Sequence, residues 1–356
     1  MATDANNMMV MPDDLREFVT KLFAKQNLPQ EEAAIVADHL VEADLRGVYS
    51  HGVIRCLPYI QRLQAGGMNP RPSIRILRET PGTAVVDGDN GAGQVVGVRA
   101  MEIAIKKAKA VGISYVGVRM SNHFGTCAYY AQMALAHDMI GFATTVGGTN
   151  IMAPTGGISP LVGNNPFGVA LPADKEYPVI LDMACSVVAK GKIVHAMKAG
   201  TPIPIEWATD KEGQPTTDPK EAFEGLVLPM GGYKGYGMAF VLGVMAGLLN
   251  RAAFVGEVTD FYANMKEPQN GGHTFQVVDI KAFMDPSEFK AKMDEAIKEM
   301  HSSELARGAD RTYVPGEMEW LKRADRLENG VPVAPAVWKD LVTLSEGNGI
   351  PLPSTM

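Results

Sequence analysis

The sequence is poor in cysteine, in positive charge and in long hydrophobic runs, and each shortage excludes a class of protein. Cys56, Cys127 and Cys185 stand far apart in no paired spacing, so we expect a reduced compartment rather than a disulfide framework. The net charge of −7 leaves no basic footprint for nucleic acid. No apolar run in the chain reaches the roughly 18 residues of a membrane-spanning helix.

Several chemical motifs are missing as well. Residues 1–14 are polar and acidic and lack the basic region and apolar core of a secretory signal. No His or Cys pair stands at metal-ligand spacing, and neither a Gly-x-Ser-x-Gly elbow nor a Walker motif occurs. We therefore expect a cytoplasmic protein that needs no metal and binds neither nucleic acid nor membrane.

The chain is long enough for a mixed α/β fold. Its 356 residues, 46% of them hydrophobic, can form two or three packed units. Apolar periodicity predicts helices alternating with short strands. The expected helices cover 12–46 (as a pair), 52–64, 95–111, 126–139, 187–199, 238–249, 286–302, 318–327 and 335–346, and the expected strands cover 74–87 (as a hairpin), 113–118, 140–145, 169–172, 179–182 and 275–280.

One candidate for chemistry is the stretch Ser121-Asn122-His123-Phe124-Gly125. It follows a buried strand pattern and precedes a helical one, so His123 stands at a strand-to-helix turn. α/β enzymes often place reactive groups at such turns. Taken alone, the stretch is equally compatible with a structural histidine at the start of a helix.

A second candidate is Tyr49-Ser50-His51-Gly52-Val53-Ile54-Arg55. If Gly52 opens the next helix, His51 and Arg55 lie about one turn apart and face the same space. This pair suits a proton donor beside a carboxylate clamp, because the arginine fork donates two parallel bonds. The simpler interpretation is a capping serine followed by a solvated histidine and arginine.

A third stretch, Gly91-Ala92-Gly93, imitates a dinucleotide fingerprint but does not satisfy it. Val96 stands where the third glycine would fall, and no acidic residue closes a second strand about twenty residues later. We interpret the stretch as a tight turn into the helix over 95–111.

Two further segments favour an anion ligand. Asp182–Ser186 precedes the helix expected over 187–199, and Lys234 stands among glycines before the helix expected over 238–249. Free N–H groups at a helix start bind phosphate or carboxylate. Together with the turn histidines, they predict a phosphate-bearing organic cofactor, a small anionic substrate and histidine acid–base chemistry.

An ordered set of short motifs resembles the malate/L-lactate dehydrogenase family, which also holds sulfolactate, ureidoglycolate and diketogulonate dehydrogenases. The resemblance implies a malate/L-sulfolactate dehydrogenase-like fold with a non-Rossmann cofactor domain, NAD or NADP as cofactor, a small carboxylate substrate and a homodimer. The motifs are Ser50-His51-Gly52-Val53-x-Arg55, Asp89-Asn90-Gly91-x-Gly93-Gln94, Ser121–Gly125, Asn164-Asn165-Pro166, Asp182-Met183-Ala184-x-Ser186 with Gly191-Lys192, Pro215–Pro219, and Gly231-Gly232-x-Lys234-Gly235.

The resemblance also implies roles for individual residues. His123 matches the catalytic base, and His51 matches a second acid/base candidate with Ser50, Arg55 and Asn122 beside the substrate. The sequence leaves open which histidine is the main base. The implied cofactor contacts are Asp182, Met183, Ala184, Ser186, Lys234, Pro315, Gly316 and Glu317.

The resemblance further implies a division of the chain. We expect a helical N-terminal segment over 1–75 that carries part of the substrate site, then a substrate-side sheet and helix over 76–125. The NAD(P)-binding domain is expected over 126–285. A helical C-terminal segment, 286–356, is expected to pack back on the N-terminal part.

These observations predict an NAD(P)-dependent oxidoreductase that interconverts a small 2-hydroxy acid, of the malate, lactate or sulfolactate type, and its 2-oxo acid. The family usually has Thr-Asn after the strand over 140–145, where this chain has Val146-Gly147-Gly148-Thr149-Asn150, and Thr155 stands where tryptophan is common. The alternatives are therefore a cyclic imine carboxylate or diketogulonate-type reductase, or a nucleotide- or metabolite-binding protein without turnover. A serine hydrolase built on Ser50-His51 is disfavoured, because triads join residues distant in sequence.

Overall fold

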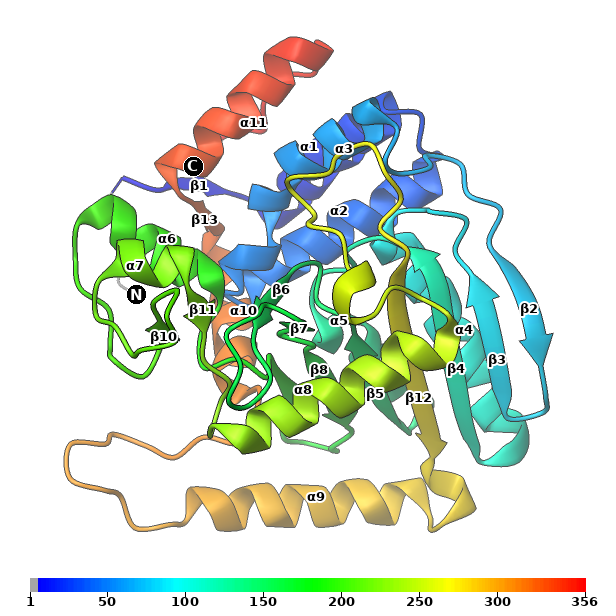
Figure 1. The fold of residues 1–356 in the computed structure, drawn as a ribbon. Helices are drawn as coiled ribbons and strands as arrows, with labels where there is room; N and C mark the ends of the chain where they lie inside the picture. Colours follow the sequence, from blue (N-terminus) through cyan, green and yellow to red (C-terminus); the bar gives the residue numbers. More distant parts are fainter. Residues whose placement is uncertain (1–5) are drawn as a thin grey trace.

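The computed structural model describes residues 6–356, and a seven-stranded mixed sheet forms its centre (Figure 1). Only the β3–β4 pair is parallel, and every other neighbouring pair in this sheet is antiparallel. The boundary expected at residue 125 falls between strands of this one sheet, and the division of the chain stays a prediction. In spatial order the strands are β2 (Arg75–Glu79), β3 (Thr83–Asp87), β4 (Ile113–Ser121), β12 (Gly271–Asp279), β5 (Met139–Thr145), β8 (Phe167–Leu171) and β9 (Val179–Met183).

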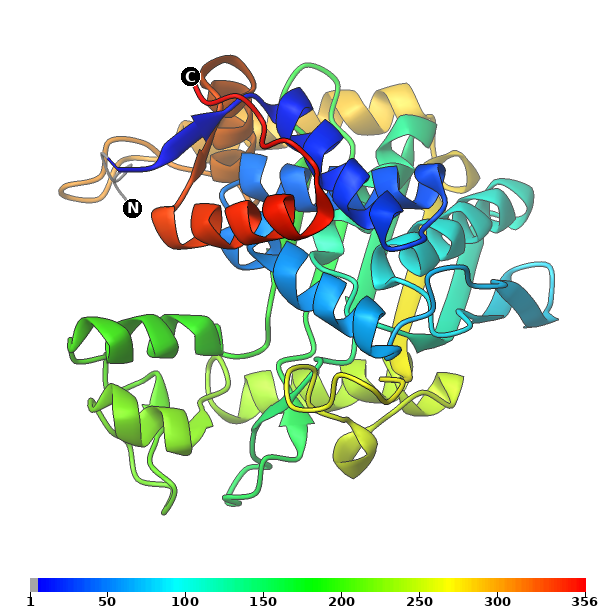
Figure 2. The same ribbon diagram turned by 90° about the horizontal axis from the view of Figure 1, so that it is seen from above.

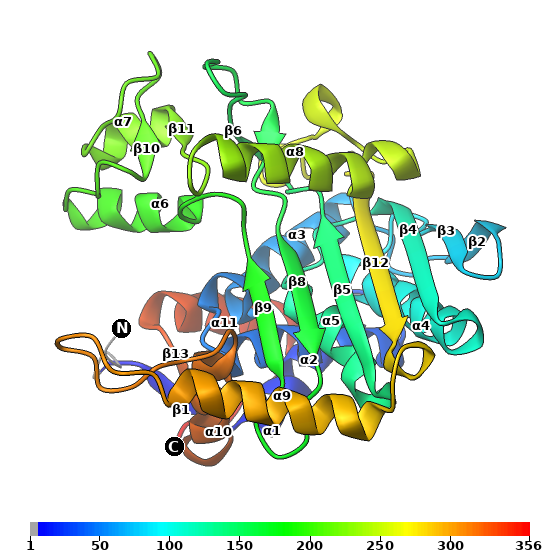
Figure 3. The same cartoon turned by 90° about the horizontal axis from the view of Figure 1, so that it is seen from below.

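Helices cover the sheet and bury its apolar side chains. The amphipathic helix α4 (Gly93–Val111) and the short helix α5 (Cys127–Ala131) pack on one face, where they enclose Met101 and Phe275 in a core without solvent contact. Figure 3 shows α8 (Tyr233–Ala246) and α9 (Pro286–His301) crossing the strands near opposite ends.

A second core joins the two ends of the chain. It contains α1 (Pro12–Lys25), α2 (Gln30–Leu45) and α3 (Cys56–Ala65). The C-terminal segment returns to this layer, as Figure 2 shows. Its elements are α10 (Glu317–Asn329), β13 (Val331–Val333), which pairs with β1 (Met8–Val10), and α11 (Pro335–Asn348).

A small lobe stands to one side of the sheet in all three views. Its own apolar cluster includes Ile193, Ala222 and Val227, and it continues under α8 through Ala239. The lobe consists of α6 (Lys190–Ala199), β10 (Ala208–Thr209), α7 (Pro219–Glu224) and β11 (Leu226–Val227), and the hairpin β6 (Asn150–Met152) with β7 (Val162–Gly163) packs beside it.

Most expected elements are confirmed within a few residues, but the helix expected over 52–64 is wrong in its first turn. Residues Tyr49–His51 and Val53–Arg55 form two separate 3-10 turns, and α3 begins only at Cys56. The cause is the carboxylate of Asp44, which accepts a 2.7 Å hydrogen bond from the Val53 N–H. It occupies the space where a Cβ on Gly52 would lie.

The helix start expected after Asp182–Ser186 is also wrong. α6 begins at Lys190, because the preceding residues pair with another part of the chain. Ser186 forms a β-bridge with Pro229, and the Val187 N–H donates to Leu228 O at 2.9 Å. This segment therefore does not present the free N–H groups of a helix N-terminus.

Two other helices differ in extent. The helix expected over 126–139 is α5 followed by a 3-10 helix, Gln132–His137, and β5 already begins at Met139. α8 begins at Tyr233, five residues earlier than expected, so Lys234 lies in its first turn. The remaining 3-10 turns are Leu248–Asn250, Val255–Glu257 and Ile280–Ala282. Across residues 6–356, no helix combines the length and apolar character that crossing a bilayer demands.

Candidate active site

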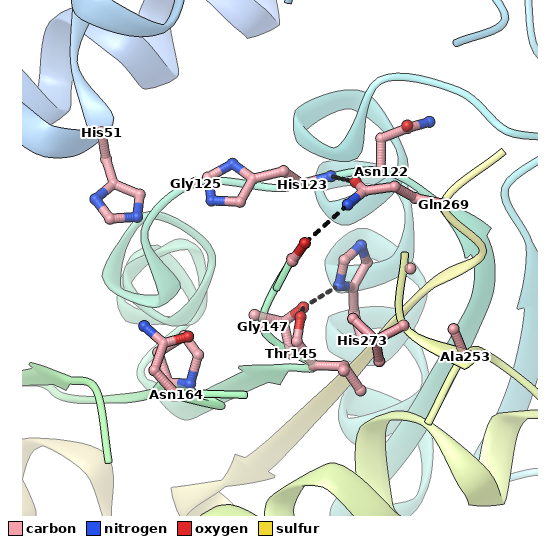
Figure 4. A pocket seen from close by; sticks show the side chains of 15 residues that line it. His51, Asn122, His123, Gly125, Thr145, Gly147, Asn164, Ala253, Gln269 and His273 are labelled. Atoms are coloured by element: carbon pink, nitrogen blue, oxygen red, sulfur yellow. Dashed lines mark hydrogen bonds between the residues drawn. The ribbon is translucent and has the colours of Figure 1, made fainter. Parts of the chain in front are cut away.

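A pocket with about 520 Å³ of free space, part of it open to solvent, lies where β4, β5 and β12 meet the helical layer. Figure 4 shows His51 and His123 on one side of it, with Thr145 and Gly147 on another. Two glycines of the atypical loop, Gly147 and Gly148, form part of its wall. The structure thus places both expected histidines at one pocket.

His123 follows the last residues of β4, and close backbone packing fixes the turn. A Cβ on Gly93 would collide with the carbonyl oxygens of Asn122 and His123, so only glycine allows α4 to begin this close to the turn. The His123 backbone N–H donates to Gln269 Oε1 at 3.1 Å. The backbone of the turn that carries the imidazole is therefore held by contacts from two other segments.

The two histidine rings are stacked. Their centroids are 5.4 Å apart with an interplanar angle of 21°. His51 Nδ1 lies 2.8 Å from Ser50 Oγ, and His123 Nδ1 lies 2.6 Å from Tyr59 Oη. Each ring thus has one nitrogen engaged by a hydroxyl group, and its other nitrogen has no hydrogen-bond partner within residues 6–356.

Arg55 is not in the pocket wall, but its positive charge acts on both histidines from beside it. Its Nε donates to Ser50 O at 2.6 Å and its Nη1 donates to Tyr262 Oη. No carboxylate of the described chain forms an ion pair with it. A guanidinium without an acidic partner is free to bind the carboxylate of a ligand.

Both histidines are neutral at ordinary pH. Burial lowers the pKa of His51 to about 3, and the charge of Arg55 adds to the shift. Burial, then Arg55 and His51, lower the pKa of His123 well below its usual value. A neutral imidazole keeps a lone pair for a proton, so the pocket holds both rings in a form that can act as a base.

The side chain of Asn122, unlike that of His123, is fully hydrogen-bonded within the protein. Its amide nitrogen donates to Asn90 O and Gly91 O, both at 2.9 Å, and its Oδ1 accepts from Arg62 Nε at 3.0 Å. All polar atoms of this side chain are used inside the fold, and the residue is fully buried. Its side chain holds the turn in place and offers no free group to a substrate.

Sequence reasoning missed several residues of the site. Tyr59 bonds to His123 and lies four residues after Arg55, one helical turn further along α3, so helical spacing gave a usable signal. Gln94, which donates to Tyr59, stands inside a motif that carries the family resemblance. Gln269 and His273 line the pocket from distant segments, and no local pattern pointed to them.

Two of the expected cofactor residues, Ser186 and Lys234, belong to segments that backbone hydrogen bonds connect to the pocket. Asn164 lines the pocket, and its carbonyl accepts from Cys185 N at 2.8 Å. The Cys185 carbonyl in turn accepts from Met230 N at 2.9 Å, just before α8. Ser186 is buried with no hydrogen-bond partner for its hydroxyl in the described chain, and Lys234 is exposed.

The other expected cofactor residues lie along β9 and against it. Asp182 and Met183 end this strand, Ala184 follows, and an Asp182 carboxylate oxygen accepts from Ala128 N at 2.9 Å. Burial raises the pKa of Asp182 to about 6. None of these residues is in the pocket wall.

Pro315, Gly316 and Glu317 also lie outside the pocket wall and contact β9 or its surroundings. Pro315 O accepts from Ile180 N at 3.0 Å, and Gly316 packs on Ile180. The Glu317 carboxylate accepts hydrogen bonds from His301, Arg311 and Val314 N.

Comparison with known proteins shows which family the chain resembles. A model described as malate/L-lactate dehydrogenase matches residues 10–342. L-sulfolactate dehydrogenase of Methanocaldococcus jannaschii is 43% identical over 324 residues, which cover 90% of this chain and 93% of that protein. The chain belongs to the malate/L-lactate dehydrogenase family. Membership confirms the resemblance, and it makes the protein an oxidoreductase of the 2-hydroxy-acid dehydrogenase type.

Two further members extend the comparison. The solved structure of malate dehydrogenase from Pyrococcus horikoshii matches with a TM-score of 0.90 and 39% identity, over 99% of this chain and 98% of that one. This match confirms the expected family fold. Ureidoglycolate dehydrogenase (NAD(+)) of Escherichia coli K12 is 31% identical over 94% of this chain and 95% of that protein. A nicotinamide cofactor is therefore implied for the family member described here.

Within residues 6–356, no three or more His, Cys, Asp or Glu side chains are grouped to hold a metal ion.

Proposed function

We propose that this protein interconverts a small 2-hydroxy acid and its 2-oxo acid with NAD or NADP, and that His123 exchanges the hydroxyl proton. The observation that carries the proposal is the stacked, neutral pair His51–His123 beside Arg55, a guanidinium without a carboxylate partner in the described chain. Alcohol oxidation needs a base at the hydroxyl group, and an anionic substrate needs a cation to hold it.

In this proposal each polar group has a distinct task. Arg55 holds the substrate carboxylate, which fixes the orientation of the carbon that reacts. His123 takes the hydroxyl proton on its free Nε2. His51, whose Nδ1 is hydrogen-bonded to Ser50, contacts the substrate with its own ring beside His123. A bound nicotinamide would supply the group that accepts or donates hydride.

The chain has features that suit a dinucleotide. Gly147 and Gly148 present backbone without side chains at the pocket wall, and the buried Ser186 hydroxyl lacks a partner within residues 6–356. Ser186 pairs with Pro229, a few residues before the start of α8, and we assign Lys234 in the first turn of α8 to a phosphate group of the cofactor. We assign Asp182, Met183 and Ala184, which connect the end of β9 to Ser186, to the same site. Pro315, Gly316 and Glu317 support β9 from outside.

We further propose a homodimer. α8 is strongly apolar, yet Phe240 and Val241 are 43% and 56% exposed, and Leu248 and Leu249 just beyond it are exposed as well. An apolar surface of this kind is typical of an interface between protein chains. Sedimentation velocity of the wild-type chain tests this: a monomer at micromolar concentration would contradict it.

A substrate and cofactor panel tests the activity itself. Malate, lactate and sulfolactate with NAD and with NADP, and the corresponding 2-oxo acids with the reduced cofactors, would be followed by nicotinamide absorbance. We expect turnover of at least one acid pair. Reduction of a cyclic imine carboxylate alone would instead indicate an imine reductase, and tight cofactor binding without any turnover would indicate a binding protein.

A further inference from the structure

A chain of three side chains leads from the interior of the protein to the His123 ring. Gln94 Nε2 donates to Tyr59 Oη at 3.2 Å, and Tyr59 Oη lies 2.6 Å from His123 Nδ1. Gln94 is fully buried and Tyr59 is 1% exposed. Neither residue forms a hydrogen bond with any other side chain in the described structure, so the hydrogen-bonded series ends at Gln94.

The direction of these hydrogen bonds decides which nitrogen of His123 carries the proton. An amide nitrogen only donates, so Gln94 Nε2 cannot accept the Tyr59 hydroxyl hydrogen, and His123 Nδ1 is the acceptor that this arrangement leaves for it. A neutral imidazole that accepts at Nδ1 carries its hydrogen on Nε2. In this arrangement Nε2, the nitrogen without a protein partner, has no lone pair to receive a substrate proton.

The opposite arrangement needs an acceptor for Tyr59, and Gln94 has one. Its Oε1 is buried and has no hydrogen-bond partner within residues 6–356. If the amide turns over, Oε1 accepts the Tyr59 hydrogen and Tyr59 Oη accepts from Nδ1–H of His123. Nε2 then has a lone pair as a base, and the same arrangement accommodates the imidazolium after proton uptake, because Nδ1–H keeps its acceptor.

We propose that Gln94, acting through Tyr59, is a positioning residue that sets the tautomer of His123 and lets its Nε2 take up and return the substrate proton. This inference rests on the proposed function of His123. No proton leaves Tyr59 or Gln94: burial raises the pKa of Tyr59 to about 12, so its hydroxyl only turns. The other titratable or charged groups whose charge acts on His123 are Arg55, His51, His39 and His273, and the His51 ring stacks on it directly.

Two substitutions at one position separate the tautomers. In Gln94→Met the Tyr59 hydrogen has only His123 Nδ1 as acceptor, so we expect the Nε2–H tautomer. In Gln94→Glu a carboxylate accepts from Tyr59, so we expect the Nδ1–H tautomer and a raised pKa of His123. Nitrogen NMR of histidine labelled with nitrogen-15 distinguishes the two forms, and His123→Asn identifies the resonances among the seven histidines.

The NMR measurement uses ligand-free protein, so it remains decisive even if the activity panel fails. The same His123 tautomer in both variants overturns the proposal. Tyr130→Phe is the matched control, because it removes a buried hydroxyl that donates to Phe124 O and does not reach the His123 ring. We expect it to leave the His123 spectrum unchanged.

If the activity panel succeeds, turnover provides a second readout. We expect Gln94→Met to lower kcat about tenfold or more in both directions, because a buried hydroxyl hydrogen loses its acceptor whenever His123 is protonated at Nδ1. Gln94→Glu should keep kcat within about threefold at high pH, with the acid limb of its pH profile moved upward. Equal kcat losses in both variants would show that Gln94 serves only packing.

Discussion

The two walls of the pocket hold their histidines in different ways. On the sheet side, His123 follows the nine-residue strand β4, its N–H is fixed by Gln269, and its ring is fixed by Tyr59. On the helical side, His51 ends a three-residue 3-10 turn, and the side-chain partner of its ring is the exposed Ser50. Buried partners orient the His123 ring, whereas a residue of a surface turn orients the His51 ring.

The difference teaches which histidine suits which task. A base must meet the hydroxyl group at hydrogen-bond distance and in one tautomer, which favours the ring that buried partners hold. A residue that admits and binds a substrate benefits from a wall that can adjust. The contrast supports His123 as the main base and His51 as its partner, a choice that the sequence left open.

The strongest test of this contrast is His123→Ala. Loss of the base should lower kcat about 10²–10⁴-fold, while the affinity for NADH, measured by fluorescence titration, should stay near the wild-type value. If cofactor binding is lost as well, His123 is a structural or binding residue and the contrast fails.

His51→Ala should have a smaller effect. We expect kcat/KM to fall about 10–100-fold, because one substrate contact is lost while the base remains. Steady-state kinetics of both alanine variants under one set of conditions provides the comparison. A larger loss of kcat in His51→Ala than in His123→Ala would reverse the assignment.

Arg55→Lys tests the shared cation. A lysine keeps the charge but loses the planar fork, so KM for the carboxylate substrate should rise about tenfold while kcat changes little. Arg78→Lys on the exposed strand β2 is the control and should leave both constants unchanged. Unchanged kinetics in Arg55→Lys would remove Arg55 from the site.

The smallest effect should appear in the pH profile. Because the pKa values of His51 and His123 are lowered, their neutral forms persist below the ordinary histidine pKa of about 6.5. We expect kcat/KM for hydroxy-acid oxidation to stay level as pH falls from 8 to 6. Arg55→Gln removes a positive charge, so the acid limb should move to higher pH by a fraction of a unit, whereas Arg55→Lys should not move it.

The sequence came close on the elements that local pattern controls. The strand before His123 and the tight glycine turn at Gly93 are where periodicity and glycine placement put them. The predicted helix starts were wrong where a group of another segment binds the backbone. The Asp44 carboxylate binds Val53 N and breaks the helix expected from Gly52, and pairing with Pro229 keeps Ser186 extended. Neither contact leaves a trace in a local window.

The sequence by itself determined the family and the class of chemistry, and it singled out the two histidines that the fold brings to one pocket, because short motifs in fixed order record what the chemistry needs. Only the tertiary structure decided how His51 and His123 stack, that the Asn122 side chain is fully hydrogen-bonded inside the fold, and that Tyr59 and Gln94 lie behind the His123 ring. The reason is physical: hydrogen-bond direction, burial and pKa depend on groups that the fold brings together from separate segments.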